Sequence, residues 1–296
     1  MTDNARFGAV GTAMVTPFDA ELRLDITAAA ELAKWLCSHG SDFLVVSGTT
    51  GESPTLSDDE KADLWRAVSS AVDAPVLAGT STSDTAHSVA LTREALRCGV
   101  SGILAVTPYY SRPSQAGIEA HFRAVAAAAG DLPVVVYDIP VRTGRKIAPD
   151  VILRLADEGV IAGVKDATAN PAATAELIAR CPPGFDVYSG NDADNLALLA
   201  LGAVGVISVE SHWAGELVGE MAAAFFKGDV DLARSINARL IASHRFQSSD
   251  ETPNPVPAKA AMRALGHAVG QCRPPVGDAP AHLDIAASRL IESLRG

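Results

Sequence analysis

Residues 102–137 read GILAVTPYYSRPSQAGIEAHFRAVAAAAGDLPVVVY. Two short apolar runs, Gly102–Val106 and Val134–Tyr137, stand on either side of a helix-length segment, Gln115–Ala129. A strand, a helix and a second strand in this order are typical of a parallel βαβ unit. The fold therefore depends on how often this unit repeats.

The same alternation extends in both directions along the chain. The predicted strands are Ala9–Val15, Phe43–Val46, Val76–Ala78, Gly102–Val106, Val134–Tyr137, Ile161–Lys165, Asp186–Ser189 and Val204–Val209. The predicted helices between and after them are Ile26–His39, Ser57–Val72, Asp84–Cys98, Gln115–Ala129, Pro149–Ala156, Pro171–Ala179, Ala193–Leu201 and Ala214–Phe226. Eight strands alternating with eight helices predict an α/β fold, the closed (β/α)₈ TIM barrel. A doubly wound dinucleotide fold is disfavoured, because Gly11-Thr12-Ala13-Met14 does not supply its Gly-x-Gly-x-x-Gly turn.

Local signals mark several helix starts and a C-terminal extension. Ser57 with Glu60 predicts a capping box, and Asp84, Pro149 and Pro171 stand where a helix begins. Three further helices are predicted at Val230–His244, Pro257–Leu265 and Ala279–Leu294, separated by proline-rich joints. We therefore expect a catalytic barrel over residues 1–228 and a three-helix extension over residues 229–296.

Composition and charge limit the possible partners. The 296 residues carry 24 Lys and Arg against 35 Asp and Glu, a formal net charge of −11. This charge repels phosphate backbones and acidic lipid surfaces, so we expect no nucleic acid and no membrane as partner. Met1–Arg6 lacks the apolar segment of a secretory signal, which predicts a cytoplasmic protein. The cysteines, all far apart in the sequence, are expected to be four buried reduced thiols: Cys37, Cys98, Cys181 and Cys272.

The sixth predicted strand ends in the strongest chemical signal. Val160–Val164 is an apolar run and Lys165 follows it directly. In a barrel the reactive groups come from the carboxyl ends of the strands, so Lys165 is expected at the barrel mouth. Burial would lower its pKa from about 10.4 and free the amine to form a Schiff base with a carbonyl substrate. The alternative is a structural lysine paired with Asp166 or Glu52.

Polar residues follow three other predicted strands. In Ser47-Gly48-Thr49-Thr50-Gly51-Glu52 glycines flank two hydroxyls, which lets backbone N–H groups approach a small anion such as a carboxylate. An ordinary glycine-rich turn would have the same pattern. Thr107–Pro113 contains the adjacent tyrosines Tyr109 and Tyr110, which interface stacking would also explain. Tyr137–Gly144 offers a phenol at the barrel mouth and the Arg142 guanidinium just above it.

Together these motifs resemble the dihydrodipicolinate synthase and N-acetylneuraminate lyase superfamily of class I aldolases, and most closely its synthase branch. The resemblance covers nearly the whole chain. It rests on Gly48–Ser53, Thr107–Pro113, Tyr137 with Arg142–Gly144, Gly163–Ala167, Ser189–Asp192 and Gly205–Val209, in the family's order and near its spacing. Asn254–Lys259 resembles the family's entry into its C-terminal helices. The resemblance implies a homotetramer of barrels, a dimer of dimers, with no cofactor.

The resemblance also implies a mechanism. Lys165 would condense with pyruvate, and the enamine formed from the imine would add to the aldehyde of L-aspartate 4-semialdehyde. Ring closure would displace Lys165 and release 4-hydroxy-tetrahydrodipicolinate, a precursor in lysine (diaminopimelate) biosynthesis. Tyr137 would act as general acid and base. Because a phenol of pKa about 10 is a poor base at neutral pH, Tyr137 would work in a relay with Thr49 and with Tyr110 of the neighbouring subunit.

Four residues are implied to hold the substrates. Thr49 and Thr50 would bind the pyruvate carboxylate, and Ile207 would place a backbone carbonyl near the nucleophile. Arg142 would bind the carboxylate of the second substrate by bidentate pairing. Another aldolase of the same superfamily, such as N-acetylneuraminate lyase or a keto-deoxy-sugar acid aldolase, is the first alternative, but those sugar lyases generally lack this arginine.

A non-catalytic barrel that binds a keto acid as a sensor or scaffold is the second alternative. A degenerate copy of the enzyme should have lost part of the catalytic set. The set is complete in this chain: Thr49, Tyr110, Tyr137 and Lys165 are all present.

Feedback control by L-lysine is expected to be weak or absent. In lysine-sensitive relatives the effector is held by a glutamate, an asparagine and a histidine beside the first tyrosine of the pair. The matching positions here are His87, Ser83 and Asp58, next to Tyr109. With His87 in place of the carboxylate, the effector ammonium would be left without a partner.

Three other features receive structural interpretations. No two of the seven histidines have the spacing of a helical metal site, so we expect no metal; they are His39, His87, His121, His212, His244, His267 and His282. Asn191–Asn195 lacks the glycine and glutamate of a calcium loop and is expected to be a capped helix start. Asp58–Lys61 is expected to be a solvated first turn of a helix.

Overall fold

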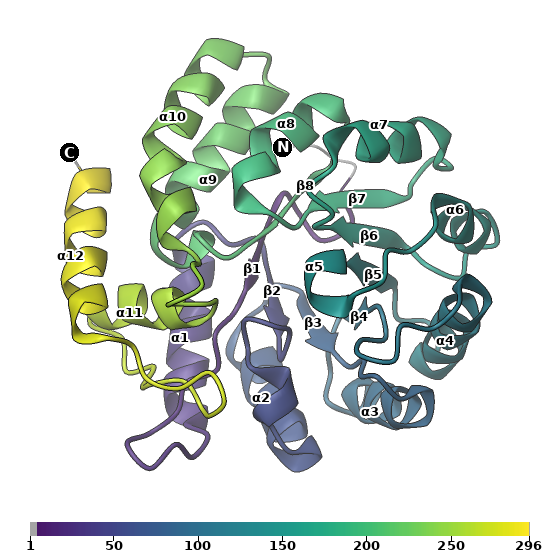
Figure 1. Cartoon of the computed structure of the whole chain (residues 1–296), viewed down its shortest axis with the longest axis horizontal. Coiled ribbons are helices and arrows are strands. Elements are labelled where there is room, and N and C mark those ends of the chain that lie inside the picture. The colour runs from purple at the N-terminus through teal and green to yellow at the C-terminus, as the bar shows by residue number, and fades with distance from the viewer. Residues whose placement is uncertain (1–4, 296) are drawn as a thin grey trace.

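The computed structural model describes residues 5–295 and confirms the predicted barrel (Figure 1). Its strands pair in parallel in chain order, and β8 closes the sheet on β1. The strands are β1 (Val10–Ala13), β2 (Phe43–Val46), β3 (Val76–Gly79), β4 (Gly102–Val106), β5 (Val134–Asp138), β6 (Gly163–Asp166), β7 (Asp186–Ser189) and β8 (Gly205–Ser208). Two predictions fall partly outside the described residues. The one about a secretory signal concerns Met1–Arg6, of which residues 1–4 are not described. The barrel predicted over residues 1–228 and the extension predicted over residues 229–296 also begin and end at residues that are not described.

Helices surround the barrel in the predicted order. They are α1 (Ile26–Ser38), α2 (Asp58–Ala71), α3 (Thr85–Arg97), α4 (Gln115–Ala129), α5 (Pro140–Thr143), α6 (Pro149–Asp157), α7 (Pro171–Arg180), α8 (Asn195–Leu201) and α9 (Ser211–Phe226), with the short 3₁₀ helices η1 (Ser53–Thr55) and η2 (Asp192–Asp194). The capping box of Ser57 and Glu60 is present, and the Asp84 carboxylate accepts hydrogen bonds from the N–H groups of Ala86 and His87. Pro149 and Pro171 begin their helices, as predicted.

The strands bury side chains on both faces. One cluster fills the inside of the barrel and includes Phe43, Leu77, Leu104, Val135, Tyr137, Tyr188 and Ile207. The larger cluster lies between the outer face and the helices, and Val164 of β6 belongs to it. Because successive side chains of a strand point to opposite faces, Lys165 points into the barrel. This alternation is what brings the predicted amine to the centre of the molecule.

Three helices follow the barrel, as predicted: α10 (Val230–Phe246), α11 (Val256–Ala264) and α12 (Ala281–Arg295). In Figure 1 they gather on one side, beside α1 and α9. None of the helices in residues 5–295 is long and apolar enough to cross a membrane.

Three local predictions are wrong in detail. All four cysteines are free, but only Cys98 and Cys272 are buried, since Cys37 and Cys181 lie nearer the surface. Asn191–Asn195 does begin a helical segment, but neither η2 nor α8 receives a side-chain cap. The side chains at the two cap positions pair with each other instead, because the Asn191 amide donates to the Asp194 carboxylate at 2.7 Å.

The first turn of α2 is also less solvated than predicted. Asp58 and Asp59 are exposed, but Lys61 is buried and Glu60 pairs with Arg273 of the C-terminal extension at 2.6 Å. The reason is that the extension covers this turn, which local sequence does not reveal.

Candidate active site

The predicted nucleophile lies between two tyrosines inside the barrel. Tyr137 of β5, Lys165 of β6 and Tyr188 of β7 are register partners on adjacent strands. The Lys165 side chain is buried, and its Nζ lies 4.4 Å from the centroid of the Tyr137 ring. Burial and, to a smaller extent, the positive charge of Arg142 lower the pKa of Lys165 to about 8. The negative charge of Asp192 acts in the opposite direction and raises it. About a tenth of the amine is therefore unprotonated at pH 7, against well under a thousandth for a lysine with an ordinary pKa of about 10.4.

The two acids considered as structural partners of Lys165 are engaged elsewhere. Glu52 forms a buried ion pair with Lys259, with Oε1 and Nζ 2.7 Å apart. Asp166 accepts hydrogen bonds from the Thr168 N–H and the Thr174 hydroxyl. Within residues 5–295, no acidic side chain forms an ion pair with Lys165. The geometry therefore favours a reactive lysine over a structural one.

The phenol beside the amine has a perturbed pKa in the opposite direction. Burial raises the pKa of Tyr137 to about 12, although the Arg142 charge and hydrogen bonding with the Thr49 side chain lower it. A phenol with this pKa holds its proton at neutral pH, so it can take up a proton only by passing its own to a neighbour. Thr49 is the neighbour that the structure places there.

A cavity of about 220 Å³ opens above these groups, and its lining includes Thr49, Tyr109, Tyr137, Ile139 and Arg142. It is smaller than the roughly 300–1,000 Å³ of a pocket for a drug-sized ligand. A substrate of a few heavy atoms suits this volume. The structure thus brings the phenol, one threonine hydroxyl and the guanidinium to a single cavity beside the buried amine.

The remaining predicted site residues have different surroundings. Tyr110 is 93% exposed, does not line the cavity of its own chain and has a left-handed backbone φ of 68°. Thr50 is buried, and its hydroxyl accepts a hydrogen bond of 2.9 Å from the Asn254 side chain. Ile207 is buried in the inner cluster with Tyr137.

Sequence reasoning missed two residues near the site. Asp192 follows β7 at the barrel mouth, where its buried charge acts on Lys165. Its position three residues after a predicted strand was the available signal. Asn254 comes from the extension, and nothing in its local sequence points to the site.

The structure also shows where the residues of the predicted effector site lie. His87 Nε2 lies 2.9 Å from the Asp58 carboxylate, and Tyr109 hydrogen-bonds with the Ser83 backbone. In the part of the chain that the structure describes, no group of three His, Cys, Asp or Glu residues is arranged to hold a metal ion.

Comparison with known proteins shows which proteins this chain is similar to. A model of the dihydrodipicolinate synthetase family matches residues 6–293. The 4-hydroxy-tetrahydrodipicolinate synthase of Acidothermus cellulolyticus is 48% identical over 300 residues, which cover 99% of this chain and 96% of the relative. The dihydrodipicolinate synthase of Bacillus anthracis has a TM-score of 0.93 and 37% identity, over 97% of this chain and 98% of its own. That of Cyanidioschyzon merolae, solved with lysine bound, has a TM-score of 0.94 and 39% identity, over 98% of both chains.

Proposed function

The chain belongs to the dihydrodipicolinate synthetase family, and from this we propose that it condenses pyruvate with L-aspartate 4-semialdehyde to form 4-hydroxy-tetrahydrodipicolinate in lysine (diaminopimelate) biosynthesis. The observation that carries the proposal is Lys165, which is buried beside a small cavity, has a pKa of about 8 and has no acidic partner among the described residues.

The proposed reaction begins at the Lys165 amine. Its lone pair attacks the ketone carbon of pyruvate, and loss of water gives an imine. The imine withdraws electrons, so a methyl proton leaves and the enamine forms. The enamine carbon then bonds to the aldehyde carbon of the semialdehyde, whose oxygen takes up a proton. Finally the amine of the second substrate attacks the imine carbon and the C–N bond to Lys165 breaks, which closes the ring and restores the free lysine.

In this proposal Tyr137 exchanges the protons and Thr49 connects it to Tyr110 of a second subunit. The high pKa of Tyr137 supports the need for such a relay, since an isolated phenol would not give up its proton near neutral pH. The 93% exposure of Tyr110 supports a contribution to another copy of the chain. We propose a homotetramer, a dimer of dimers, on this ground and on the family resemblance, and a cytoplasmic location on the resemblance alone.

Substrate binding is assigned to four residues. Thr49 and Thr50 bind the pyruvate carboxylate, and Ile207 contributes a backbone carbonyl near the nucleophile. Arg142 binds the carboxylate of the semialdehyde, because its guanidinium lines the cavity and offers two parallel donors.

Borohydride trapping tests the central step. Reduction in the presence of pyruvate should add the reduced pyruvyl mass to the peptide that contains Lys165, and Lys165→Arg should abolish the adduct. Lys259 is an internal control, since it is equally buried but paired with Glu52 and should stay unlabelled. Labelling of another lysine, or of none, would disprove the mechanism. A coupled assay with L-aspartate 4-semialdehyde then tests the second substrate.

A further inference from the structure

The loop Gly48–Glu52, which supplies the two threonines, is attached to the C-terminal extension at three points. The Asn254 side chain donates a hydrogen bond to the Thr50 hydroxyl. Lys259 Nζ pairs with Glu52 Oε1 at 2.7 Å. The backbone N–H of Arg273 donates to Glu52 Oε2 at 2.8 Å. All three contacts join residues more than 200 positions apart in the chain, so they fix this loop relative to a different part of the molecule.

The ion pair between Glu52 and Lys259 is sealed from water. Each side chain is 1% exposed. The ammonium also donates to the Gln271 carbonyl at 2.8 Å and lies 4.1 Å from the centroid of the Phe18 ring. A buried charge is tolerated when a partner of opposite charge and further hydrogen bonds are supplied. Here Lys259 has the Gln271 carbonyl besides its partner, and Glu52 has the Arg273 N–H. The pair is therefore a rigid attachment, not a flexible surface contact.

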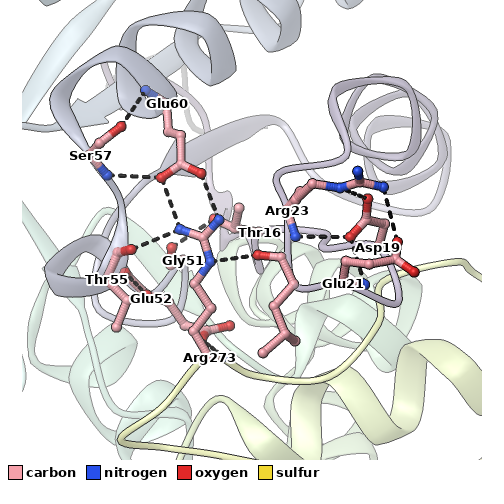
Figure 2. A network of polar contacts seen from close by, with 11 residues as sticks. Thr16, Asp19, Glu21, Arg23, Gly51, Glu52, Thr55, Ser57, Glu60 and Arg273 are labelled. Atoms are coloured by element: carbon pink, nitrogen blue, oxygen red, sulfur yellow. Dashed lines mark hydrogen bonds and ion pairs between the residues drawn. The ribbon is translucent and has the colours of Figure 1, made fainter.

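The Arg273 side chain extends the attachment beyond Glu52. Figure 2 shows its guanidinium between Glu60 and Thr55, where it pairs with the Glu60 carboxylate and donates to the Thr55 carbonyl. The same guanidinium lies 4.3 Å from the Phe18 ring. Arg273 thus holds both the carboxyl end of the loop and the start of α2.

The loop needs such support because its backbone is strained at Glu52, its last residue, and at Ser47, the residue that precedes it. Ser47 and Glu52 have left-handed φ angles of 54° and 55°, which side-chain-bearing residues rarely adopt. Strained residues of this kind persist only when the surrounding structure holds them. Thr49 and Thr50 lie between these two points, so a shift of Glu52 would move both hydroxyls. Displacements of about 1 Å are enough to lower catalytic rates strongly.

We propose that Asn254, Lys259 and Arg273 are positioning residues that hold the Thr49–Thr50 loop in the geometry that binds the pyruvate carboxylate. The extension is then part of the substrate site and does more than stabilise the barrel. This inference rests on the proposed function, because it concerns the capture of pyruvate at Lys165.

The test measures the pyruvate concentration that half-saturates borohydride trapping at Lys165. Asn254→Ala loses one hydrogen bond at the surface of the loop and should raise this concentration between about twofold and tenfold. The KM for the semialdehyde should stay within about twofold of the wild type, because Arg142 is untouched. Lys259→Met should have a larger effect, although the unpaired Glu52 carboxylate it leaves can prevent folding, which makes Asn254→Ala the deciding variant.

Two controls separate positioning from general stability. Asp284→Asn removes the ion pair between α12 and Arg263 within the extension. It leaves the hydrogen bond of Arg263 to the Gly270 carbonyl and all contacts with the loop in place, so pyruvate saturation should be unchanged. In a Thr50→Val background, Asn254→Ala should have little further effect, because Asn254 acts through the Thr50 hydroxyl.

The outcomes are distinguishable. If the wild type shows no trapping at Lys165, the proposed function itself is wrong. If the wild type is trapped but Asn254→Ala saturates at the same pyruvate concentration, only the positioning role is overturned. The same conclusion follows if Asp284→Asn produces an equal shift, or if the effects of Thr50→Val and Asn254→Ala are fully additive.

Discussion

The reactivity of a single lysine depends on its protonation, and Lys165 has a pKa of about 8 because it is buried. Its amine is nucleophilic only when unprotonated, so the rate of imine formation with pyruvate should rise about tenfold from pH 7 to pH 9 and then level off. Quenched borohydride trapping at saturating pyruvate measures this rate. Asp192→Asn removes the charge that favours the ammonium form and should move the midpoint to lower pH. A flat profile, or a midpoint near pH 10, would contradict the effect of burial.

Arg142 determines a different property of the site, the choice of the second substrate. Hydrogen bonds to charged groups contribute about 1.5–3 kcal/mol, so Arg142→Ala should lower kcat/KM for the semialdehyde roughly 10-fold to 150-fold. Pyruvate imine formation should persist, because Lys165 and Thr49 remain. Arg142→Lys is the matched control, since it keeps the charge but loses the fork of parallel donors. Unchanged kinetics with the semialdehyde would point to a different acceptor aldehyde.

At the scale of elements, the alternation of strands and helices predicted the barrel, but pairing decides where each strand begins. The sixth strand was expected from Ile161 and begins at Gly163. The reason is that the N–H groups of Val160 and Ile161 donate to the Leu155 carbonyl, closing α6 instead of joining the sheet. Ala214, the predicted start of the eighth helix, is instead a kink inside α9 with φ −132°. The boundary between barrel and extension near residue 228 stays a prediction.

In the candidate site, some features could be predicted from local sequence, and others depend on contacts between residues far apart in the chain. The clustering of Tyr137, Lys165 and Thr49 followed from their places at the carboxyl ends of parallel strands. The hydrogen bond between Asn254 and Thr50 spans 204 residues, and no local periodicity encodes such a contact. The proposed place of Tyr110 in the relay follows neither from local sequence nor from contacts within one chain, because it depends on a second copy of the chain.

Asp138, at the end of β5, makes the stability of the fold depend on pH. Burial raises the pKa of Asp138 to about 7, with a smaller contribution from the neighbouring Asp166 charge. Between about pH 4 and pH 7 this carboxyl is protonated in the folded chain but ionised in the unfolded chain. Rising pH therefore lowers the free energy of unfolding across this window, by at most about 1.4 kcal/mol per pH unit.

Asp138→Asn removes this titration while its side-chain oxygen can still accept the Ile147 N–H. Relative to the wild type, the variant should become progressively more stable from pH 5 to pH 7, with little further change above pH 8. Urea unfolding at fixed protein concentration across this range measures the difference. Other buried acids titrate in both proteins and cancel. A difference independent of pH would contradict the raised pKa.

At the scale of the whole molecule, the exposure of Tyr110 predicts active sites that are shared between subunits. Lys165→Met and Tyr110→Phe should each be strongly impaired alone. In a mixed dimer, one site would combine the intact Lys165 of one subunit with the intact Tyr110 of the other. After subunit exchange, mixing the two variants should therefore restore activity toward about a quarter of the wild type. No gain on mixing, with exchange confirmed by mass spectrometry, would place the relay within one chain.

Control by the pathway's end product also depends on the assembled surface, and L-lysine should inhibit this enzyme weakly or not at all. An effector ammonium needs a carboxylate, but the matching position holds His87, and the nearby Asp58 carboxylate is already engaged by that histidine at 2.9 Å. A buried ammonium without a partner costs too much for useful affinity. Activity should therefore stay nearly flat up to millimolar L-lysine, and calorimetry should detect no tight binding. The Cyanidioschyzon merolae relative, solved with lysine bound, is the positive control for binding. Saturable inhibition at micromolar L-lysine would show that the effector site uses other residues.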